Sequence, residues 1–189
     1  MAKVSKEEIT FYNLDGEEIQ KKMKTVDWDA EAAEKAGYEH FMMKEIHEQP
    51  RAVKDTLNSV LKDGKIDLTD IGLAEEDIRR TSQIYIVACG SAYHVGMVAQ
   101  YVIEDLVKIP VRVELASEFR YRKPILDPNG LVIIISQSGE TADSLAALRE
   151  TKAQGIRTLG IVNVVGSSIA REEDKVFYTL SLIHISEPT

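Results

Sequence analysis

Short apolar runs alternate with helix-like segments along the second half of this chain, and the alternation limits the possible folds. The runs are rich in β-branched residues and bounded by Gly, Pro and Ser, as expected for buried strands. They span 84–89, 131–135 and 158–162, with one more beginning at 175–178, while 111–115 alternates apolar and charged residues like a strand nearer the edge of a sheet. Strands connected through helices run parallel, with right-handed crossovers. The sequence therefore predicts an α/β fold: a three-layer αβα, doubly wound, flavodoxin-like parallel sheet.

Helical periodicity fills the intervals between these runs. We expect helices over 93–107 and 142–154, the second capped by Gly155, and a short helix or loop over 116–122. Apolar residues of the first helix are expected on its inner side, and they are Val95, Val98, Ala99, Val102, Ile103 and Leu106.

The segment before the first strand also has a helical pattern, over residues 38–61. Pro50 lacks the N–H that a helix interior needs, so we expect two helices that meet at Gln49-Pro50. Gly64 is expected to end the second helix. Further on, Ile66, Leu68 and Ile71 are expected to anchor an irregular segment on a neighbouring surface.

The N-terminal residues differ in character from the rest. Asp15-Gly16 lies between two short alternating segments, which predicts a β-hairpin within residues 1–24. Because an isolated hairpin is marginally stable in water, we interpret it as the edge of a larger missing unit. Residues 25–37 are acidic, rich in alanine and contain Trp28, and we interpret them as a linker.

Composition excludes several classes of protein. The formal net charge of −8 argues against a nucleic-acid-binding protein, which would present a basic face. The chain has no apolar run long enough to cross a membrane, and its charged N-terminus does not resemble a signal peptide. Cys89 is the only cysteine, so neither an intramolecular disulfide nor a cysteine metal cluster is expected. Together these features predict a cytoplasmic protein without a metal.

Small hydroxyl residues gather where the run 131–135 ends. Ser136, Ser138, Thr141 and Ser144 surround a glycine, with no cation among them. Free N–H groups at a helix start, supplemented by hydroxyls, can hold a phosphate without Lys or Arg. The alternative is a plain N-cap, in which Ser138 or Thr141 satisfies the first helical amides. A second loop of this kind, Gly90-Ser91, follows another strand, and a Gly/Ser turn follows the run 158–162. Because loops after parallel strands converge on one edge of the sheet, we favour a ligand site.

Four motifs occur together, in an order and spacing that resemble those of a known family. They are Met-Lys-Glu-Ile-His-Glu-Gln-Pro at 43–50, Ala-Cys-Gly-Ser-Ala-Tyr at 88–93, Ala-Ser-Glu-Phe-Arg-Tyr-Arg at 116–122 and Ser-Gln-Ser-Gly-Glu-Thr-Ala-Asp-Ser at 136–144. The last motif is typical of the sugar isomerase (SIS) superfamily. The combination resembles the glutamine–fructose-6-phosphate aminotransferases (isomerising), and the resemblance extends from the N-terminus to about Thr179.

The resemblance implies a domain organisation. Members of this family have a glutaminase domain followed by two SIS subdomains, and they convert fructose 6-phosphate and glutamine to glucosamine 6-phosphate. Residues 1–24 would then be the edge of the glutaminase domain, 25–37 a linker and 38–179 the first SIS subdomain. Residues 180–189 resemble a translated sequencing adaptor, and we expect them to be a non-native tail. The glutaminase cysteine and the second SIS subdomain, with the Schiff-base lysine and the acid/base Glu and His, would be missing.

The resemblance also implies site residues. A phosphate would be bound by Ser136, Gln137, Ser138 and Thr141, and the sugar side of the pocket would be lined by Cys89, Gly90 and Ser91. The family often has a hydroxyl residue where this chain has Ala92, which puts one sugar contact in doubt.

Several neighbouring residues permit a catalytic or a structural interpretation, and no cofactor is implied. We interpret Cys89 as a packing thiol and not a nucleophile, because no base accompanies it in sequence. Glu140 is interpreted as a structural carboxylate and not a catalytic base, and His94 as a structural or rim residue. Arg120, Arg122 and Lys123 fit an anion patch, but a solvated role or a role in an interface fits them at least as well.

Two broader alternatives remain at this point. The chain is expected to be an inactive fragment of a homodimeric aminotransferase that retains half of a fructose 6-phosphate or glucosamine 6-phosphate site. The alternative is a stand-alone SIS-type phosphosugar sensor or isomerase. A second SIS subdomain downstream in the reading frame would exclude the alternative, whereas a DNA-binding segment would favour it.

Overall fold

The computed structural model describes residues 1–6, 8–21 and 35–180. The chain forms two compact units, Met1–Gly37 and Tyr38–Thr189, and each is described by itself. Residues 25–34 of the predicted linker, with Trp28, and residues 181–189 of the predicted tail lie outside the described residues.

The first unit contains a small antiparallel sheet. Its strands are β1 (Ala2–Val4), β2 (Ile9–Tyr12) and β3 (Glu18–Ile19), in the order β1-β2-β3. The predicted hairpin is present as β2–β3. Asn13 closes its loop, because the Asn13 side-chain oxygen accepts the N–H groups of Asp15 at 3.0 Å and Glu17 at 2.9 Å. The strand β1 was not predicted.

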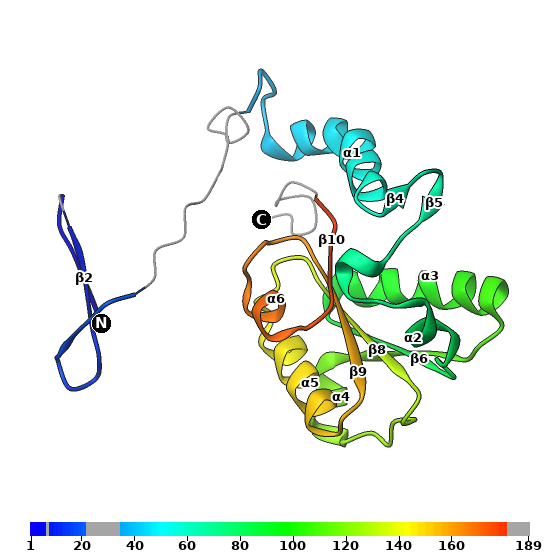
Figure 1. Ribbon diagram of the computed structural model, residues 1–189. Helices are drawn as coiled ribbons and strands as arrows, with labels where there is room; N and C mark the ends of the chain where they lie inside the picture. The colour runs from blue at the N-terminus through cyan, green and yellow to red at the C-terminus, as the bar shows by residue number, and fades with distance from the viewer. Residues whose placement is uncertain (7, 22–34, 181–189) are drawn as a thin grey trace. The chain divides into compact units, whose positions relative to one another are not determined.

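The second unit contains a five-stranded parallel sheet (Figure 1). Its strands are β6 (Ile84–Ala88), β7 (Val111–Leu115), β8 (Leu131–Ser136), β9 (Arg157–Val162) and β10 (Val176–Tyr178). Their spatial order is β10-β9-β8-β6-β7, and every neighbouring pair is parallel. Renumbered from the first parallel strand, this is the flavodoxin-like order 2-1-3-4-5, which confirms the predicted fold class.

Helices cover both faces of this sheet, which gives three layers. On one face, Phe119, Leu148 and Ile169 pack in a buried cluster with Val132 and Ile134 of β8. These three residues belong to α4 (Ala116–Arg122), α5 (Ala142–Ala153) and α6 (Ser168–Glu172). The other face carries a second buried cluster, against which α3 (Gly90–Val107) packs through Ala99 and Ile103. Val132 and Ile134 thus point to one helical layer, and Leu131 and Ile133 point to the other, because side chains alternate along a strand.

The prediction of two helices around Pro50 is wrong. A single 18-residue helix, α1 (Phe41–Asn58), continues through Pro50. Pro50 cannot donate to the carbonyl four residues earlier, which costs roughly 3 kcal/mol in a helix interior. The helix nevertheless extends over several residues on both sides of Pro50, so the proline does not mark a boundary.

Gly64 does not cap a helix, contrary to the prediction. Asp63 and Gly64 have φ angles of 50° and 73° and form the two-residue turn between β4 (Leu61–Lys62) and β5 (Lys65–Ile66). Consecutive left-handed residues are the geometry that Asp-Gly favours in tight hairpins. The segment continues through η1 (Thr69–Ile71) and α2 (Glu75–Arg79). Leu68 and Ile71 pack against the sheet as predicted, whereas Ile66 is exposed.

Helix α3 differs from the prediction at its start and on its inner side. It begins at Gly90, with Cys89 as its N-cap, and not at Tyr93. Val98 and Leu106 are 66% and 77% exposed, and Val95 and Val102 are exposed as well. The helix lies close to the sheet through Gly96, where a Cβ atom would be 2.8 Å from Ile86 Cγ2. Of the six residues predicted on the inner side, Ala99 and Ile103 pack against the sheet, whereas the other four are exposed.

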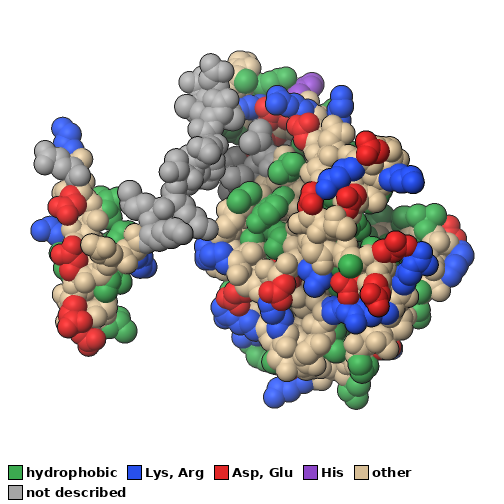
Figure 2. All heavy atoms as spheres, viewed as in Figure 1, with side chains coloured by type: hydrophobic (Ala, Val, Ile, Leu, Met, Phe, Trp, Pro, Cys, Tyr) green, Lys and Arg blue, Asp and Glu red, His purple; other side chains and the backbone are tan. Residues whose placement is uncertain are grey.

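The described surface of the second unit mixes both charges. Figure 2 shows Asp and Glu side chains interspersed with Lys and Arg on the visible face, with no broad region of one sign. Among the described residues, none of the helices has the length and apolar character that crossing a membrane requires.

Candidate functional site

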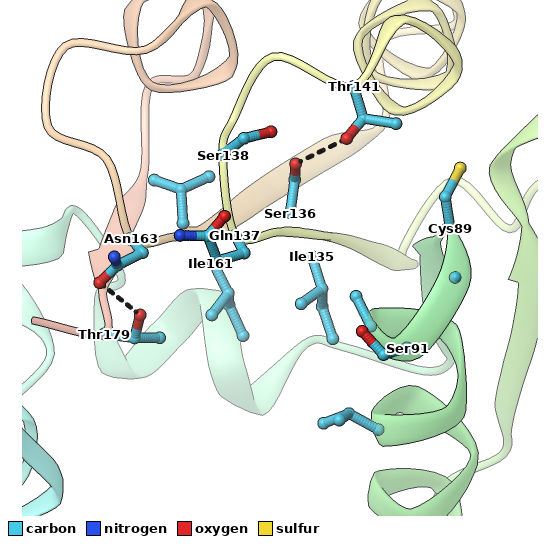
Figure 3. Close-up of a pocket in the computed structure, with 14 residues that line it drawn as sticks. Cys89, Ser91, Ile135, Ser136, Gln137, Ser138, Thr141, Ile161, Asn163 and Thr179 are labelled. Carbon is cyan, nitrogen blue, oxygen red and sulfur yellow. Dashed lines mark hydrogen bonds between the residues drawn. The ribbon is translucent and has the colours of Figure 1, made fainter. Parts of the chain in front are cut away.

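A pocket of ≈ 670 Å³ opens at the carboxyl ends of the central strands. The loops after β6 and β8 form much of its wall. Between these two neighbouring strands the strand order reverses: β7 lies on one side of β6, and the later strands β8, β9 and β10 follow on the other. Ligands bind at this switch point in open parallel sheets. The pocket is lined by Cys89, Gly90, Ser91, Ala92, Val95, Ile135, Ser136, Gln137, Ser138, Thr141, Ile161, Val162, Asn163 and Thr179 (Figure 3).

All seven residues predicted for the site line this one pocket. They are Cys89, Gly90, Ser91, Ser136, Gln137, Ser138 and Thr141. Residues far apart in sequence therefore meet as the strand order requires. Their binding roles stay a prediction, because the geometry establishes only that they share a cavity.

Ser136 braces the loop that follows β8. Its side chain is buried, and its Oγ accepts the N–H of Gly139 at 3.1 Å and lies 3.1 Å from Thr141 Oγ1 (Figure 3). These hydrogen bonds connect the end of the strand to the start of α5. Ser136 thus holds the curvature of the loop, while Thr141 remains partly exposed at the pocket wall.

Ser138 is the hydroxyl of this loop best placed to donate. Its Oγ accepts the N–H of Glu140 at 3.2 Å, which leaves the hydroxyl proton available. Within the described residues, the N–H groups of Ser138 and Thr141 have no acceptor in the protein. The loop thus combines hydroxyl and backbone donors, and these favour an anion such as a phosphate.

The start of α3 forms the opposite wall. Gly90 and Ser91 are the first residues of this 18-residue helix, whose N-terminus carries a partial positive charge. The Cys89 sulfur points away from Ser91 (Figure 3) and lies 3.8 Å from Ser144 Oγ, which donates to it. Cys89 also packs against a buried cluster of the core. Its thiol therefore faces α5, in agreement with the interpretation as a packing group.

Sequence reasoning missed two polar residues of the pocket, Asn163 and Thr179. Thr179 Oγ1 donates to Asn163 Oδ1 at 3.2 Å (Figure 3), and Asn163 N–H donates to the carbonyl of Gln137 at 3.2 Å. Asn163 directly follows β9 and Thr179 directly follows β10. The position of each residue at the carboxyl end of a parallel strand was the signal that could have identified it.

No Lys, Arg, Asp, Glu or His is among the fourteen lining residues. Arg120 pairs with Asp143 at 2.7 Å, and Arg122 pairs with Glu114, so these two arginines are used in contacts between elements. His94 is exposed and lies edge-on to Tyr93, outside the lining. Among the described residues, no group of His, Cys, Asp and Glu is arranged to bind a metal.

Glu140 lies outside the pocket lining and has a structural contact. Its carboxylate accepts the N–H of Ser168 at 2.7 Å. Hydrogen bonding from Ser168 lowers the pKa of Glu140, and the charge of Arg171 acts in the same direction. A carboxylate that is ionised and already hydrogen-bonded is poorly suited to accept a proton. This observation agrees with the structural interpretation of Glu140.

Comparison with protein families assigns the fold to a superfamily. The family model described as SIS domain matches residues 77–188, which is more than half of the chain. The chain belongs to the SIS domain family. This finding confirms the superfamily predicted from the loop at 136–141.

Individual relatives agree with the narrower resemblance. The chain is 55% identical over 177 residues to a protein of Clostridium acetobutylicum named glutamine–fructose-6-phosphate aminotransferase (isomerizing), and 54% identical over 180 residues to one of the same name from Caldanaerobacter subterraneus. These alignments cover 93% and 95% of this chain but only 29% and 30% of the relatives. The chain thus spans less than a third of their length.

A solved structure gives the same result. The C-terminal domain of glucosamine-fructose-6-phosphate aminotransferase from Francisella tularensis matches with a TM-score of 0.72 and 48% identity. The match covers 77% of this chain and 41% of that domain. The resemblance to this family, first inferred from four motifs, is confirmed.

Proposed function

We propose that this chain is a phosphosugar-binding part of a glutamine–fructose-6-phosphate aminotransferase (isomerising), with fructose 6-phosphate as its ligand. One observation carries the proposal: hydroxyl groups, free backbone N–H groups and two helix N-termini meet in a single pocket without a charged residue. Such a site suits the phosphate of a neutral sugar. The names of the relatives narrow the ligand to fructose 6-phosphate or its product, glucosamine 6-phosphate.

The phosphate is assigned to the loop at 136–141. Ser138 and Thr141 supply hydroxyl and N–H donors, Gln137 supplies an amide, and Ser136 keeps the loop in shape through Gly139. A phosphate dianion at the start of α5 also gains from the helix dipole. The sugar is assigned to the wall formed by 89–92, with the amide of Asn163 as a further polar contact.

The reaction itself is assigned to residues beyond this chain. In the intact enzyme, the proposed activity is amino transfer from glutamine with ketose–aldose isomerisation, which yields glucosamine 6-phosphate for amino-sugar synthesis. Ammonia release and opening of the sugar ring require the glutaminase domain and the second SIS subdomain that the resemblance implies. We assign no cofactor, metal, nucleic acid or membrane to the protein and propose a cytoplasmic location. The exposed apolar residues of α3, such as Val98 and Leu106, support a homodimer or an adjoining domain.

Calorimetric titration of the 189-residue chain with fructose 6-phosphate tests this proposal. Ser138→Ala removes a donor to a charged oxygen, at a cost of about 1.5–3 kcal/mol. We expect about 10- to 100-fold weaker binding. Ser82→Ala deletes an exposed hydroxyl before β6, at the opposite end of the sheet, and is the matched control. Equal affinity of wild type and Ser138→Ala would remove Ser138 from the site, and fructose binding as tightly as its phosphate would exclude a phosphate site.

A further inference from the structure

The ligand loop at 136–141 is joined to a second loop segment, at 163–169, which connects β9 to the first residues of α6. Three hydrogen bonds connect the two loops. They are Asn163 N–H to Gln137 O at 3.2 Å, Ile169 N–H to Gly139 O at 2.9 Å and Ser168 N–H to Glu140 Oε1 at 2.7 Å. The third is the shortest, and it is the only one of the three that uses a side chain. A change of one residue can therefore remove it without altering the backbone.

The two loops also pack closely. A Cβ atom at Gly139 would lie 2.0 Å from Ser167 Oγ and 2.5 Å from Ser167 Cβ. Gly139 has a φ of +65°, and Ser167 is buried. The contact leaves no room for a side chain at position 139. The residue that follows, Glu140, makes the third of the hydrogen bonds between the loops through its carboxylate.

The Glu140 carboxylate faces away from the pocket, toward the start of α6. Besides Ser168 N–H, the guanidinium of Arg171 lies nearby and donates to Ser168 Oγ at 3.0 Å. The hydrogen bond from Ser168 and the positive charge of Arg171 thus both stabilise the carboxylate charge outside the pocket. Were it released, the carboxylate would be free to approach an anion bound beside Thr141 and would repel it.

We infer that Glu140 is a positioning residue for the phosphosugar: by accepting the Ser168 N–H, its carboxylate orients the donors of Ser138 and Thr141 and keeps its own charge out of the pocket. This inference rests on the proposed function, because it assumes that the loop binds a phosphate. Glu140 itself does not touch the ligand. Its effect passes through the hydrogen bond to the second loop.

The hydrogen bond can be removed from either partner. Glu140→Ala deletes the acceptor, whereas Ser168→Pro deletes the donor. Position 168 is the first residue of α6, where proline is favoured, and Ser167 has the extended ψ of 166° that precedes proline readily. Ser168→Ala is the control, because it removes the Ser168 hydroxyl but keeps the N–H. Glu140→Gln keeps an oxygen acceptor without the charge.

Calorimetric titration of the 189-residue chain and these variants with fructose 6-phosphate provides the test, with thermal unfolding measured in parallel. We expect about fivefold weaker binding for Glu140→Ala and for Ser168→Pro, and no further loss in the double variant. Glu140→Gln and Ser168→Ala are expected to stay within about twofold of wild type. A merely structural contact would lower the unfolding temperature and leave the affinity of the folded protein unchanged.

The outcomes separate this inference from the proposed function. If wild type binds fructose 6-phosphate and both Glu140→Ala and Ser168→Pro bind it equally well, the positioning role is overturned while the site stands. Additive losses in the double variant would also overturn it, since the two changes would then act separately. If folded wild type does not bind at all, the proposed function fails and the positioning role fails with it.

Discussion

Substitution of Gly139 by alanine tests the packing beneath the ligand loop. The new Cβ atom would lie 2.0 Å from Ser167 Oγ and 2.5 Å from Ser167 Cβ, far inside van der Waals contact. Gly139 also has a φ of +65°, where an L-residue is strained. Both effects lower the stability of the folded protein, and they can be separated.

The conformational cost of alanine in the left-handed region is about 1–2 kcal/mol. Overpacking in a well-filled site adds about 1–3 kcal/mol. Gly155 supplies the matched control, because it has a φ of +71° but no heavy atom within 4 Å of the added Cβ. Gly155→Ala is therefore expected to lose only the conformational part, and Gly139→Ala is expected to lose about 1–3 kcal/mol more.

Urea denaturation followed by far-ultraviolet circular dichroism measures both losses. Ser167→Gly in the Gly139→Ala background removes the atoms that clash, and glycine is tolerated at an N-cap at a cost of a few tenths of a kcal/mol. It is expected to restore most of the excess loss. If Gly139→Ala were no less stable than Gly155→Ala, the loops would not be packed as described, and the reasoning would fail.

Three further predictions concern the core and the chemistry. Burial raises the pKa of Glu173 from its usual 4.5 to about 7, against the hydrogen bond that Thr158 Oγ1 donates at 2.6 Å. The pKa of Glu173 is higher in the folded state than in the unfolded state, so protonated Glu173 stabilises the fold. This contribution is fully present below pH 4.5 and is lost as the pH rises to about 7, which lowers the free energy of unfolding by roughly 3 kcal/mol. Glu173→Gln should flatten this part of a stability–pH curve measured in urea, and an unchanged curve would contradict the assignment. The Tyr85 hydroxyl accepts the Asp127 N–H at 3.0 Å and donates to the Gln83 side chain at 2.9 Å. Tyr85→Phe removes both hydrogen bonds and should lower the free energy of unfolding by about 1–3 kcal/mol. A loss below about 0.5 kcal/mol would mean that water replaces the hydroxyl. The 189-residue chain should form no glucosamine 6-phosphate from fructose 6-phosphate and glutamine in a chromatographic assay, and detectable product would show that it carries the catalytic groups itself.

The layout of the sheet was predictable because each strand has its own sequence signal. Fully buried runs such as 84–88 and 131–134 are apolar without alternation, and parallel connection through helices then leaves few possible orders. The convergence of the loops after β6 and β8 followed from the same rule. The site residues could be grouped from the sequence because the fold, and not the chemistry alone, brings them together.

The predictions at Pro50 and Gly64 were wrong because each relied on a single residue and not on the elements that surround it. Pro50 predicted a break, but one missing hydrogen bond does not end a helix of 18 residues. Gly64 was interpreted as a helix cap although Asp63-Gly64 is a hairpin signal of the same kind as Asp15-Gly16. The local sequence alone did not show which element would follow α1.

The inner face of α3 was predicted correctly for Ala99 and Ile103 but wrongly for its other apolar residues, for a different reason. Periodicity finds an apolar stripe but does not say whether the stripe meets the protein's own sheet or another surface. Gly96 decides the matter, since only a residue without a Cβ allows the helix to approach Ile86 so closely. Asn163 and Thr179 were missed because an isolated polar residue after a strand lacks the clustering that drew attention to 136–141.

Mapping of backbone amide shifts by NMR during titration with fructose 6-phosphate examines the phosphosugar site most directly. Binding is expected to perturb the amides of 89–91, 136–141 and Asn163, and to leave the opposite end of the sheet, around Ser82 and Asn129, unchanged. Fructose without phosphate should leave the amides of 136–141 unperturbed. A folded chain that shows no shifts at millimolar ligand, or shifts located away from this pocket, would contradict the assignment of the 136–141 loop as the phosphate site.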